Sequence, residues 1–247
     1  MPRSRYGEIY RDLKDKIETN VYPFQSFLPP ELKLVKEYSC SRNTIRRAVS
    51  LLVSDGYVQT MQGKGVRCIY HPSKKHHIPI FAGDLETFRE GALRRNIKYN
   101  EKVMEFYEFE ADEEFSQKSD FPVGTELFYV QKLHFLNDEP SVINHSYLLK
   151  AAMPDLTKEI AENSIYIYLE EELMMNIVNG KRTCTIEKVT PLDVELLKID
   201  TKEYNCLPVF ANQTFNSDGI MFEYNITRHR PDLFFFTSTA VRRTNLK

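Results

Sequence analysis

Long apolar runs are missing from this sequence of 247 residues. No stretch approaches the roughly 18 apolar residues of a membrane-spanning helix, and the opening MPRSRYGEIYRDLK is too charged for a secretory signal peptide. Glycine and proline are scarce, at 9 and 12 residues, and the hydrophobic (42%) and charged (28%) fractions are typical of a globular protein rather than a disordered one. We therefore expect a soluble, cytoplasmic protein.

Cysteine and histidine are also sparse, and their spacing argues against a metal centre. The cysteines lie far apart and lack the paired spacing of a zinc site or a dithiol redox centre: Cys40, Cys68, Cys184 and Cys206. The six histidines form no HExxH motif, and His76 and His77 lie beside lysines. We expect reduced, structural cysteines, no metal and no other cofactor.

The formal charge of −2 hides two regions of opposite sign. Residues 1–76 contain 14 Lys and Arg against 7 Asp and Glu, a charge of +7, whereas residues 77–247 contain 19 against 28, a charge of −9. A basic region attracts a polyanion and an acidic region repels one. Only the first region is therefore a plausible nucleic-acid surface.

The basic region has the pattern of three helices. Apolar residues recur at helical spacing from Tyr6 to Ile17, and residues 31–38 form a second, shorter helix after several prolines. Ser41 can cap a third helix, whose buried face carries Ile45, Ala48, Val49 and Leu52. Two helices joined by a short turn form a helix-turn-helix, and the outward face of the second carries side chains that suit DNA: Arg42, Asn43, Arg46, Arg47 and Ser50.

A hairpin follows the third helix. The strand-like runs YVQTM and VRCIY flank the loop QGKG, in which Gly63 and Gly65 allow the backbone to approach phosphates closely and Lys64 supplies charge. A hairpin after a recognition helix is a wing. Residues 71–79, HPSKKHHIP, have no apolar periodicity and are predicted to be a linker.

The acidic region mixes helices and strands. Helices are predicted at LETFREGALRRN (85–96), ADEEFSQKSD (111–120) and TKEIAENSIYIYLEEELM (157–174). Strands are predicted in KVMEFYEFEA, from LFYVQKLHFL onward, and in TCTIEKVT, LPVFANQTF, IMFEYNITRHR and LFFFTSTAV. The pattern indicates an α+β fold: a mainly antiparallel sheet with helices packed on it. We expect three parts, with a DNA-binding domain at 1–70, a linker at 71–79 and a second domain at 80–247.

Residues 28–66, LPPELKLVKEYSCSRNTIRRAVSLLVSDGYVQTMQGKGV, resemble the GntR family of bacterial transcriptional regulators. They match its Leu-Pro-x-Glu opening, its Ser-Arg-x-Thr-(Val/Ile)-Arg core and its Gly-Lys-Gly wing. The rest of the chain resembles the UTRA domain of the HutC branch, a chorismate-lyase-like fold that binds an effector. Within that branch, LTKEIAENSIYIYLEEEL (156–173) and EYNITRHRPDLFFF (223–236) are similar to trehalose operon repressors.

The resemblance implies DNA contacts from the recognition helix and the wing tip. The family's contacts fall on Arg42, Thr44, Arg46 and Gly63; arginine is the commonest bidentate reader of guanine, and threonine can bind phosphate or touch a thymine methyl. For Arg47, a solvated or phosphate-touching charge is favoured over a base contact. The chain departs from the pattern at Leu32, where relatives have arginine, so that contact is lost or altered.

The resemblance also places an effector in a cleft of the sheet. Its phosphate would meet the N–H groups of a helix start at Leu85-Glu86-Thr87-Phe88 and basic side chains of a strand, where relatives often carry Arg-x-Arg and this chain has Lys132 and His134. Positions i and i+2 of a strand share a face. Histidine weakens the charge at neutral pH, and part of the anion affinity should fade above an ordinary pKa of about 6.5, unless the bound phosphate holds the proton.

Sugar hydroxyls would be bound, by the same resemblance, from Asn144, Ser164, Glu223 and His229. Each of these residues, taken alone, is as readily an ordinary polar residue of the surface or core. The aromatic runs Phe234-Phe235-Phe236 and Tyr166-Tyr168 are read as core or dimer interface in preference to a sugar-stacking platform.

Together with the resemblance, these observations predict a homodimeric repressor of a sugar-utilisation operon, with trehalose as the preferred sugar, that binds an inverted-repeat operator and is released by a phosphosugar such as trehalose 6-phosphate. One alternative keeps the regulator but changes the effector to an amino sugar phosphate, a histidine-pathway acid or a fatty acid. A second is a chorismate-lyase-like enzyme, although no nucleophile and base pair, metal cluster or cofactor motif can be assembled from the second region.

Overall fold

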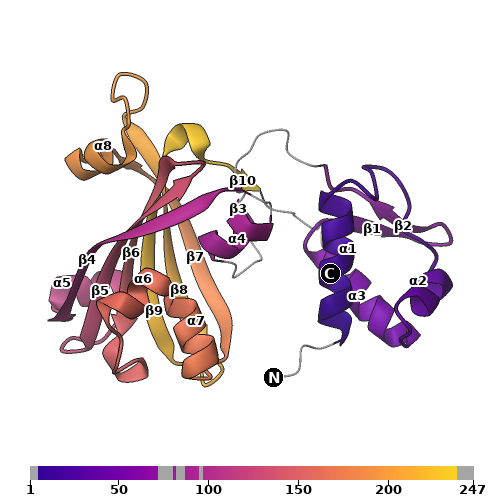
Figure 1. Cartoon of the computed structure of the whole chain (residues 1–247), viewed down its shortest axis with the longest axis horizontal. Coiled ribbons are helices and arrows are strands. Elements are labelled where there is room, and N and C mark those ends of the chain that lie inside the picture. Colours follow the sequence, from indigo (N-terminus) through magenta and orange to yellow (C-terminus); the bar gives the residue numbers. More distant parts are fainter. Residues whose placement is uncertain (1–4, 72–79, 82–86, 95–96, 238–247) are drawn as a thin grey trace, which may run out of the picture. The chain divides into compact units, whose positions relative to one another are not determined.

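The computed structural model describes residues 5–71, 80–81, 87–94 and 97–237 (Figure 1). These residues divide into two compact units, one made of 5–71 with 80–81 and 236–237, the other of 87–94 and 97–235. The predicted linker lies outside the described residues from 72 to 79. The domain boundaries 1–70, 71–79 and 80–247 remain a prediction.

The first unit contains the predicted helix-turn-helix and wing. Its helices are α1 (Arg5–Glu18), α2 (Glu31–Glu37) and α3 (Arg42–Ser54), and its hairpin joins β1 (Val58–Met61) to β2 (Gly65–Cys68). Ser41 caps α3 as predicted, because its side chain accepts a hydrogen bond from the backbone N–H of Thr44. In the wing, Val58 lies opposite Cys68 and Met61 opposite Gly65.

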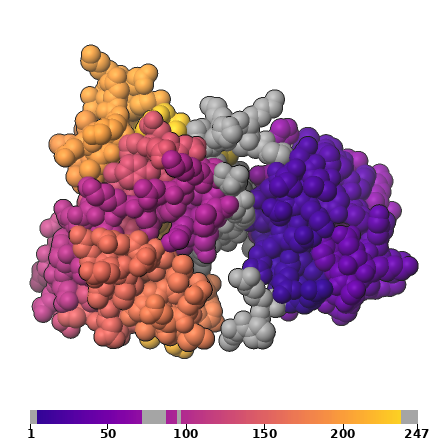
Figure 2. Space-filling model, viewed as in Figure 1, coloured from indigo at the N-terminus to yellow at the C-terminus, as the bar shows by residue number. Residues whose placement is uncertain are grey.

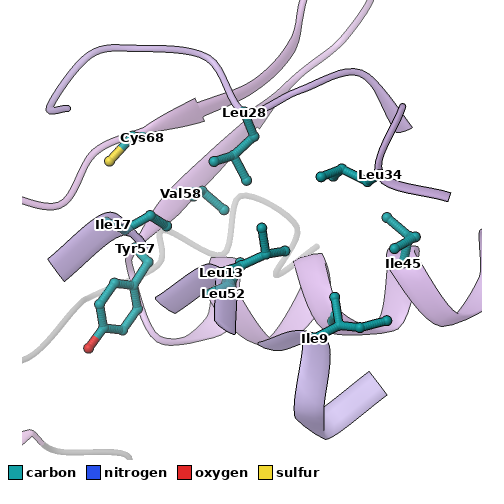
Figure 3. Packing of buried hydrophobic residues seen from close by; sticks show 11 residues of the cluster. Ile9, Leu13, Ile17, Leu28, Leu34, Ile45, Leu52, Tyr57, Val58 and Cys68 are labelled. Atoms are coloured by element: carbon teal, nitrogen blue, oxygen red, sulfur yellow. The ribbon is translucent and has the colours of Figure 1, made fainter. Parts of the chain in front are cut away.

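A single apolar cluster holds this unit together (Figure 3). From α1 come Ile9, Leu13 and Ile17, and from α3 come Ile45, Ala48 and Leu52, all essentially fully buried. Leu34 of α2 and residues of the hairpin complete the cluster. Each large aliphatic side chain contributes about 1.5–3 kcal/mol through burial. The helical spacing of these residues therefore decides which face of α3 is left outward.

The second unit is built on a six-stranded antiparallel sheet in the order β4-β5-β6-β9-β8-β7. The strands are β4 (Tyr99–Glu110), β5 (Glu126–Leu136), β6 (Glu139–Leu149), β7 (Ile177–Lys188), β8 (Cys206–Asn216) and β9 (Met221–His229). A separate parallel pair, β3 (Ile80–Phe81) and β10 (Phe236–Thr237), belongs to the first unit. The predicted antiparallel α+β sheet is confirmed.

Helices cover both faces of this sheet (Figure 1). On one face, α6 (Lys158–Asn163), α7 (Ile165–Ile167) and a π-helical turn (Tyr168–Glu172) pack on β4, β5 and β6, and α4 (Phe88–Arg94) packs against β4. On the other face lie α5 (Glu113–Ser119) and α8 (Pro191–Leu197). The 3-10 turns span Lys150–Ala152 and Pro231–Leu233.

Two parts of the sheet differ from the sequence prediction. Strand β6 forms a tight hairpin with β5 across Asn137 and Asp138, both of which have positive φ, and this turn type favours Asn and Asp; the sequence run was not divided at that turn. The strand predicted over LFFFTSTAV begins only at Phe236, because Pro231 starts a 3-10 turn that includes Leu233. Residues 238–241 of that run lie outside the described residues.

A buried ion pair attaches α8 to the sheet. Arg228 of β9 donates from Nε and Nη2 to the two carboxylate oxygens of Asp193, at 2.8 and 2.9 Å, and the Asp193 side chain is 0% exposed. Asp193 also accepts from the N–H and hydroxyl of Thr190, the N-cap of α8. One carboxylate thus satisfies both the helix cap and a guanidinium.

We predict that Asp193→Ala lowers the free energy of unfolding by about 1–3 kcal/mol, because Arg228 would lose its bidentate partner and Thr190 its cap contact, although Glu187 would still pair with the guanidinium. The measurement is urea unfolding followed by circular dichroism. The control is Glu195→Ala on the exposed side of α8, which should change stability by no more than about 0.5 kcal/mol. Equal stability of the two variants would contradict a supporting role for the pair.

Candidate DNA interface and effector site

The outward face of α3 carries the predicted DNA-binding side chains. Arg42, Asn43, Arg46 and Arg47 are all exposed, whereas Thr44 is half-buried. The side chains of Arg42 and Arg46 are 61% and 65% exposed. Because the apolar stripe of α3 is buried in the first unit, this basic face is the side of the helix that can enter a major groove.

Glu31, the glutamate of the Leu-Pro-x-Glu segment, positions two of these arginines. Arg46 Nε donates to Glu31 Oε2 at 2.8 Å, and Arg42 Nε lies 4.0 Å from Glu31 Oε1. The hydrogen bond and charge of Glu31 raise the pKa of Arg46. Glu31 begins α2, so it fixes the two arginines from a neighbouring helix. The sequence indicated Glu31 only as part of the family resemblance, with no role of its own.

Arg47 and Thr44 are engaged within the protein. The Arg47 guanidinium lies 4.0 Å from the centre of the Tyr6 ring, a cation–π contact with α1. The Thr44 hydroxyl lies 2.8 Å from the Ser41 hydroxyl at the cap. Arg47 is thus held toward α1, and this arrangement agrees better with a phosphate contact than with a base contact.

The wing tip is a turn closed by a hydrogen bond from Lys64 N to Met61 O at 3.0 Å. Gly63, its third residue, has a φ of +71°, a conformation that favours glycine. A Cβ added at Gly63 would meet no atom within 4 Å, so backbone conformation rather than crowding explains this glycine. Lys64 is exposed beside it.

Leu32, where relatives have arginine, is 57% exposed on α2.

The predicted effector residues meet on one face of the six-stranded sheet. The register places His134, Val142 and His229 in one row across β5, β6 and β9, and Lys132, Asn144 and Thr227 in the next. A third row runs through Ser146, Asn225 and Asn212 to Arg182, and a fourth includes Glu223 and Thr214. This is the face that α4, α6 and α7 cover, and Figure 2 shows the orange surface of α6 and α7 beside the magenta surface of α4.

Lys132 and His134 form a cluster with two residues of β4 that the sequence did not indicate. Lys132 Nζ donates to Glu101 Oε1 at 3.0 Å, and the Tyr99 hydroxyl donates to Glu101 Oε2. His134 Nδ1 lies 2.7 Å from the Tyr99 oxygen and 3.4 Å from Glu101 Oε2. Burial alone would raise the pKa of Glu101, but the charge of Lys132 and the hydrogen bonds from Tyr99 and Lys132 lower it. Glu101 is therefore the anionic partner of Lys132.

His134 is neutral in this cluster. Burial lowers its pKa to about 4; the nearby Glu101 opposes that shift and Lys132 adds to it. The loss of anion affinity expected above about pH 6.5 assumed an ordinary histidine pKa, and that assumption does not hold for His134 in the ligand-free protein. His134 can add positive charge only if a bound anion raises its pKa.

Phe88 joins the same cluster from α4. Its ring centre lies 5.5 Å from that of His134 and 6.2 Å from that of Tyr99. Thr87 precedes the helix and forms a capping box with Glu90: the Thr87 N–H and hydroxyl each donate to Glu90 Oε2 at 2.8 Å, and Glu90 N donates back at 3.2 Å. Leu85 and Glu86, the first half of the predicted anion-binding helix start, lie outside the described residues.

Glu223 is fully satisfied by hydroxyl groups. Its carboxylate accepts from Tyr166 at 2.7 Å, Ser146 at 3.0 Å and Thr214 at 3.3 Å, and burial raises its pKa against the effect of these hydrogen bonds. Tyr166 belongs to α7, so this carboxylate ties the covering helix to the sheet. The aromatic pair was predicted as core or interface: Tyr168 is buried, while Tyr166 contributes a polar contact to this site.

A row of amides continues from Glu223 toward the sheet edge. Asn225 Nδ2 donates to Ser146 Oγ at 2.9 Å and to the predicted Asn144, Asn212 Nδ2 donates to Asn225 at 3.2 Å, and Arg182 Nε donates to Asn212 at 2.8 Å. Amides donate and accept, as sugar hydroxyls do. The sequence pointed to Asn144 only, because which polar residues share a row depends on strand register.

The remaining predicted residues have local roles. Ser164 caps α7 by accepting from Ile167 N at 3.3 Å, and the neighbouring Asn163 carbonyl accepts from Arg89 of α4 at 2.7 Å. His229 Nε2 lies 2.9 Å from the Thr227 hydroxyl, and its ring packs on Phe210 and Phe234. Burial lowers the pKa of His229 to about 3. His229 is therefore neutral, and it lies in the same row as His134, on the other side of Val142.

The described residues bring together no group of three or more His, Cys, Asp or Glu side chains that could hold a metal ion. All four cysteines are described, and each is a free thiol. No described helix has the length and apolarity needed to cross a membrane.

Comparison with known proteins identifies both halves of the chain. The model described as bacterial regulatory proteins, gntR family, matches residues 5–68, and the UTRA domain model matches residues 94–234. The HTH-type transcriptional regulator TreR of Bacillus subtilis is 31% identical over 98% of this chain and 99% of its own length. The chain belongs to the GntR family and carries a UTRA domain.

Other relatives of this GntR regulator agree with that assignment. GmuR of Bacillus subtilis is 27% identical over 97% of this chain and all of its own length. The solved structure of YydK from the same species matches with a TM-score of 0.76 at 20% identity, covering 96% of this chain and 100% of that one. The solved effector-binding domain of TreR covers 59% of this chain and 99% of its own, at 30% identity and a TM-score of 0.51.

As a GntR regulator with a UTRA domain, the protein binds operator DNA and a small-molecule effector. Its relatives are named transcriptional regulators, so it is a regulator and not an enzyme. The alternative of a chorismate-lyase-like enzyme is therefore wrong.

We predict that Arg46→Ala weakens operator binding by about 1–3 kcal/mol and relaxes base preference at the position it reads. A gel-shift titration against the operator and single-base variants measures both effects. Arg11→Ala, which removes an exposed arginine of α1, is the matched control and should change affinity much less. Unchanged operator binding by Arg46→Ala would contradict the prediction that α3 is the recognition helix.

Proposed function

We propose that this GntR regulator is a homodimeric, cytoplasmic repressor of a sugar-utilisation operon, with trehalose as the leading candidate, and that a phosphorylated sugar such as trehalose 6-phosphate releases it from DNA. The observation that carries the proposal is the division of the polar sheet face. A lysine lies at one end, in the Lys132 cluster, and a row of amides and hydroxyls runs from Asn144 to Asn212 at the other.

A sugar phosphate has the same division of chemistry. Its phosphate requires cationic or N–H donors, and its hydroxyls require groups that both donate and accept. Lys132 is a buried cation of the face, and its neighbours across β6 and β9, Asn144 and Thr227, begin the row of amides and hydroxyls that ends at Arg182. The near full-length similarity to TreR, whose solved effector-binding domain is described as that of the trehalose repressor, supports trehalose over other sugars.

The DNA-binding residues of the proposal are those on α3 and the wing: Arg42, Asn43, Thr44, Arg46, Arg47, Gly63 and Lys64. A dimer is proposed because one recognition helix reads only a half-site, and two half-sites supply the affinity and spacing specificity that an operator needs. The effector acts by favouring one arrangement of the two DNA-binding heads over another. Residues 71–79 connect the units in sequence and are the proposed coupling segment.

A different effector is the principal rival. Relatives at 25% to 29% identity include repressors named for mannosyl-D-glycerate, fructoselysine and histidine utilisation. An amino sugar phosphate, a histidine-pathway acid or a fatty acid would each place different groups on the amide row. A thermal-shift screen separates them, because a ligand at 100 times its Kd adds about 2.7 kcal/mol of stability.

We predict that trehalose 6-phosphate dissociates the protein from its operator while trehalose does so poorly. Lys132→Gln should bind trehalose 6-phosphate at least about tenfold more weakly (about 1.4 kcal/mol) and should still bind DNA, because the lost contact is a charge-assisted hydrogen bond. Lys102→Gln, an exposed lysine on the neighbouring strand, is the control. Calorimetric titration of the full chain measures affinity; equal affinity for the two sugars would count against a phosphate at Lys132.

We also predict that the operator is a short inverted repeat bound by one dimer, because a two-fold protein reads a two-fold site. Footprinting should show two protected half-sites related by symmetry, and binding should weaken steeply with salt as phosphate-bound counterions are released. Full-affinity protection of a single asymmetric half-site by one subunit would contradict the dimer.

A further inference from the structure

The Lys132 cluster already contains an anion. Lys132 Nζ lies 3.0 Å from Glu101 Oε1, and the two side chains are 9% and 12% exposed. The Tyr99 hydroxyl donates to the second carboxylate oxygen, so both oxygens of Glu101 are engaged. Because His134 is neutral, the cluster as a whole carries no net charge in the ligand-free protein.

This arrangement is unfavourable for simple anion binding. An incoming phosphate would meet Lys132 with its charge already neutralised by Glu101. It would also lie close to the Glu101 carboxylate, and two negative charges repel each other strongly where both are shielded from water. Stability alone does not account for the pair, since a buried ion pair contributes little relative to apolar side chains of the same volume.

We propose that Glu101 is an internal competitor for the anionic group of the effector: it occupies Lys132 in the ligand-free protein, and the effector's phosphate binds by displacing it. This inference rests on the proposed function for the placement of the phosphate at Lys132. Glu101 is then a specificity-determining residue, although it need not touch the bound effector.

The expected consequence is discrimination against small anions. Inorganic phosphate would gain only the contact with Lys132 on displacing Glu101, whereas a phosphosugar would also form hydrogen bonds with the amide row around Asn144 and Asn225. The regulator would thus respond only to a ligand that carries both an anionic group and a sugar, even where inorganic phosphate is far more abundant.

The test compares the full chain with Glu101→Gln, using trehalose 6-phosphate, trehalose and inorganic phosphate as three separate probes in calorimetry and thermal shift. Glu101→Gln removes the competing charge and keeps the shape, so binding of both phosphate-containing probes should tighten by at least about tenfold, and trehalose binding should not change. The control is Glu105→Gln, an exposed carboxylate on the same strand, which should leave all three affinities unchanged.

A second variant covers the case in which Glu101→Gln does not fold, since it leaves Lys132 buried without a counter-charge. Tyr99→Phe keeps the ring and the ion pair but removes the hydroxyl that holds Glu101 in place. Phosphate-containing probes should bind more tightly to it also, by a smaller factor. In the double variant Glu101→Gln Lys132→Gln the gain should disappear, because the cation itself is gone.

The outcomes separate the two proposals. If trehalose 6-phosphate fails to bind the unmodified chain, the proposed effector is wrong, and inorganic phosphate still decides the role of Glu101. Unchanged or weaker phosphate binding in Glu101→Gln would overturn the proposal that Glu101 competes with the phosphate. If Glu101→Gln is unfolded, the same result in Tyr99→Phe would overturn it. A gain for trehalose equal to the gain for trehalose 6-phosphate would also overturn it, since removal of a charge would then not be the cause.

Discussion

The cost of removing polar groups from water is the constraint on which the effector domain depends. Its sheet buries Lys132, Glu101 and Glu223 beneath covering helices, and each must find partners there because an unpaired buried charge is expensive. Lys132 pairs with Glu101, while Glu223 accepts from three hydroxyls. These polar groups are therefore satisfied within the protein, and in our proposal an effector would bind by exchanging these contacts for its own.

The same principle organises the two faces of the sheet differently. On the face opposite the effector site, Arg228 and Asp193 form a bidentate pair that also caps α8, and nothing in that pair is left for a ligand. On the effector face, the partners come from α7 and from the edge strand β4, as Tyr166 and Glu101 show. In the first unit, Glu31 likewise holds Arg46, but both side chains stay exposed enough for DNA to compete.

Much of the architecture was predictable because it follows from local patterns. Apolar spacing located α1 and α3, Ser41 identified a helix cap, and the glycine-containing QGKG loop indicated the wing. The hairpin at Asn137-Asp138 was missed although its residues favour that turn, and the strand after Pro231 was predicted too early. Family resemblance supplied Lys132, His134, Asn144 and Glu223, which do share one face.

The sequence by itself determined the two-part organisation of charge, the family and the outward basic face of the recognition helix, since these depend on residues close together in the chain. Only the tertiary structure decided that Glu101 neutralises Lys132, that Tyr166 reaches Glu223, and that burial lowers the pKa of His134 to about 4. These facts depend on strand register and burial, which bring together residues 31 and 57 positions apart. The residues close to a buried charge in the sequence do not indicate which distant residue will lie beside it in the fold.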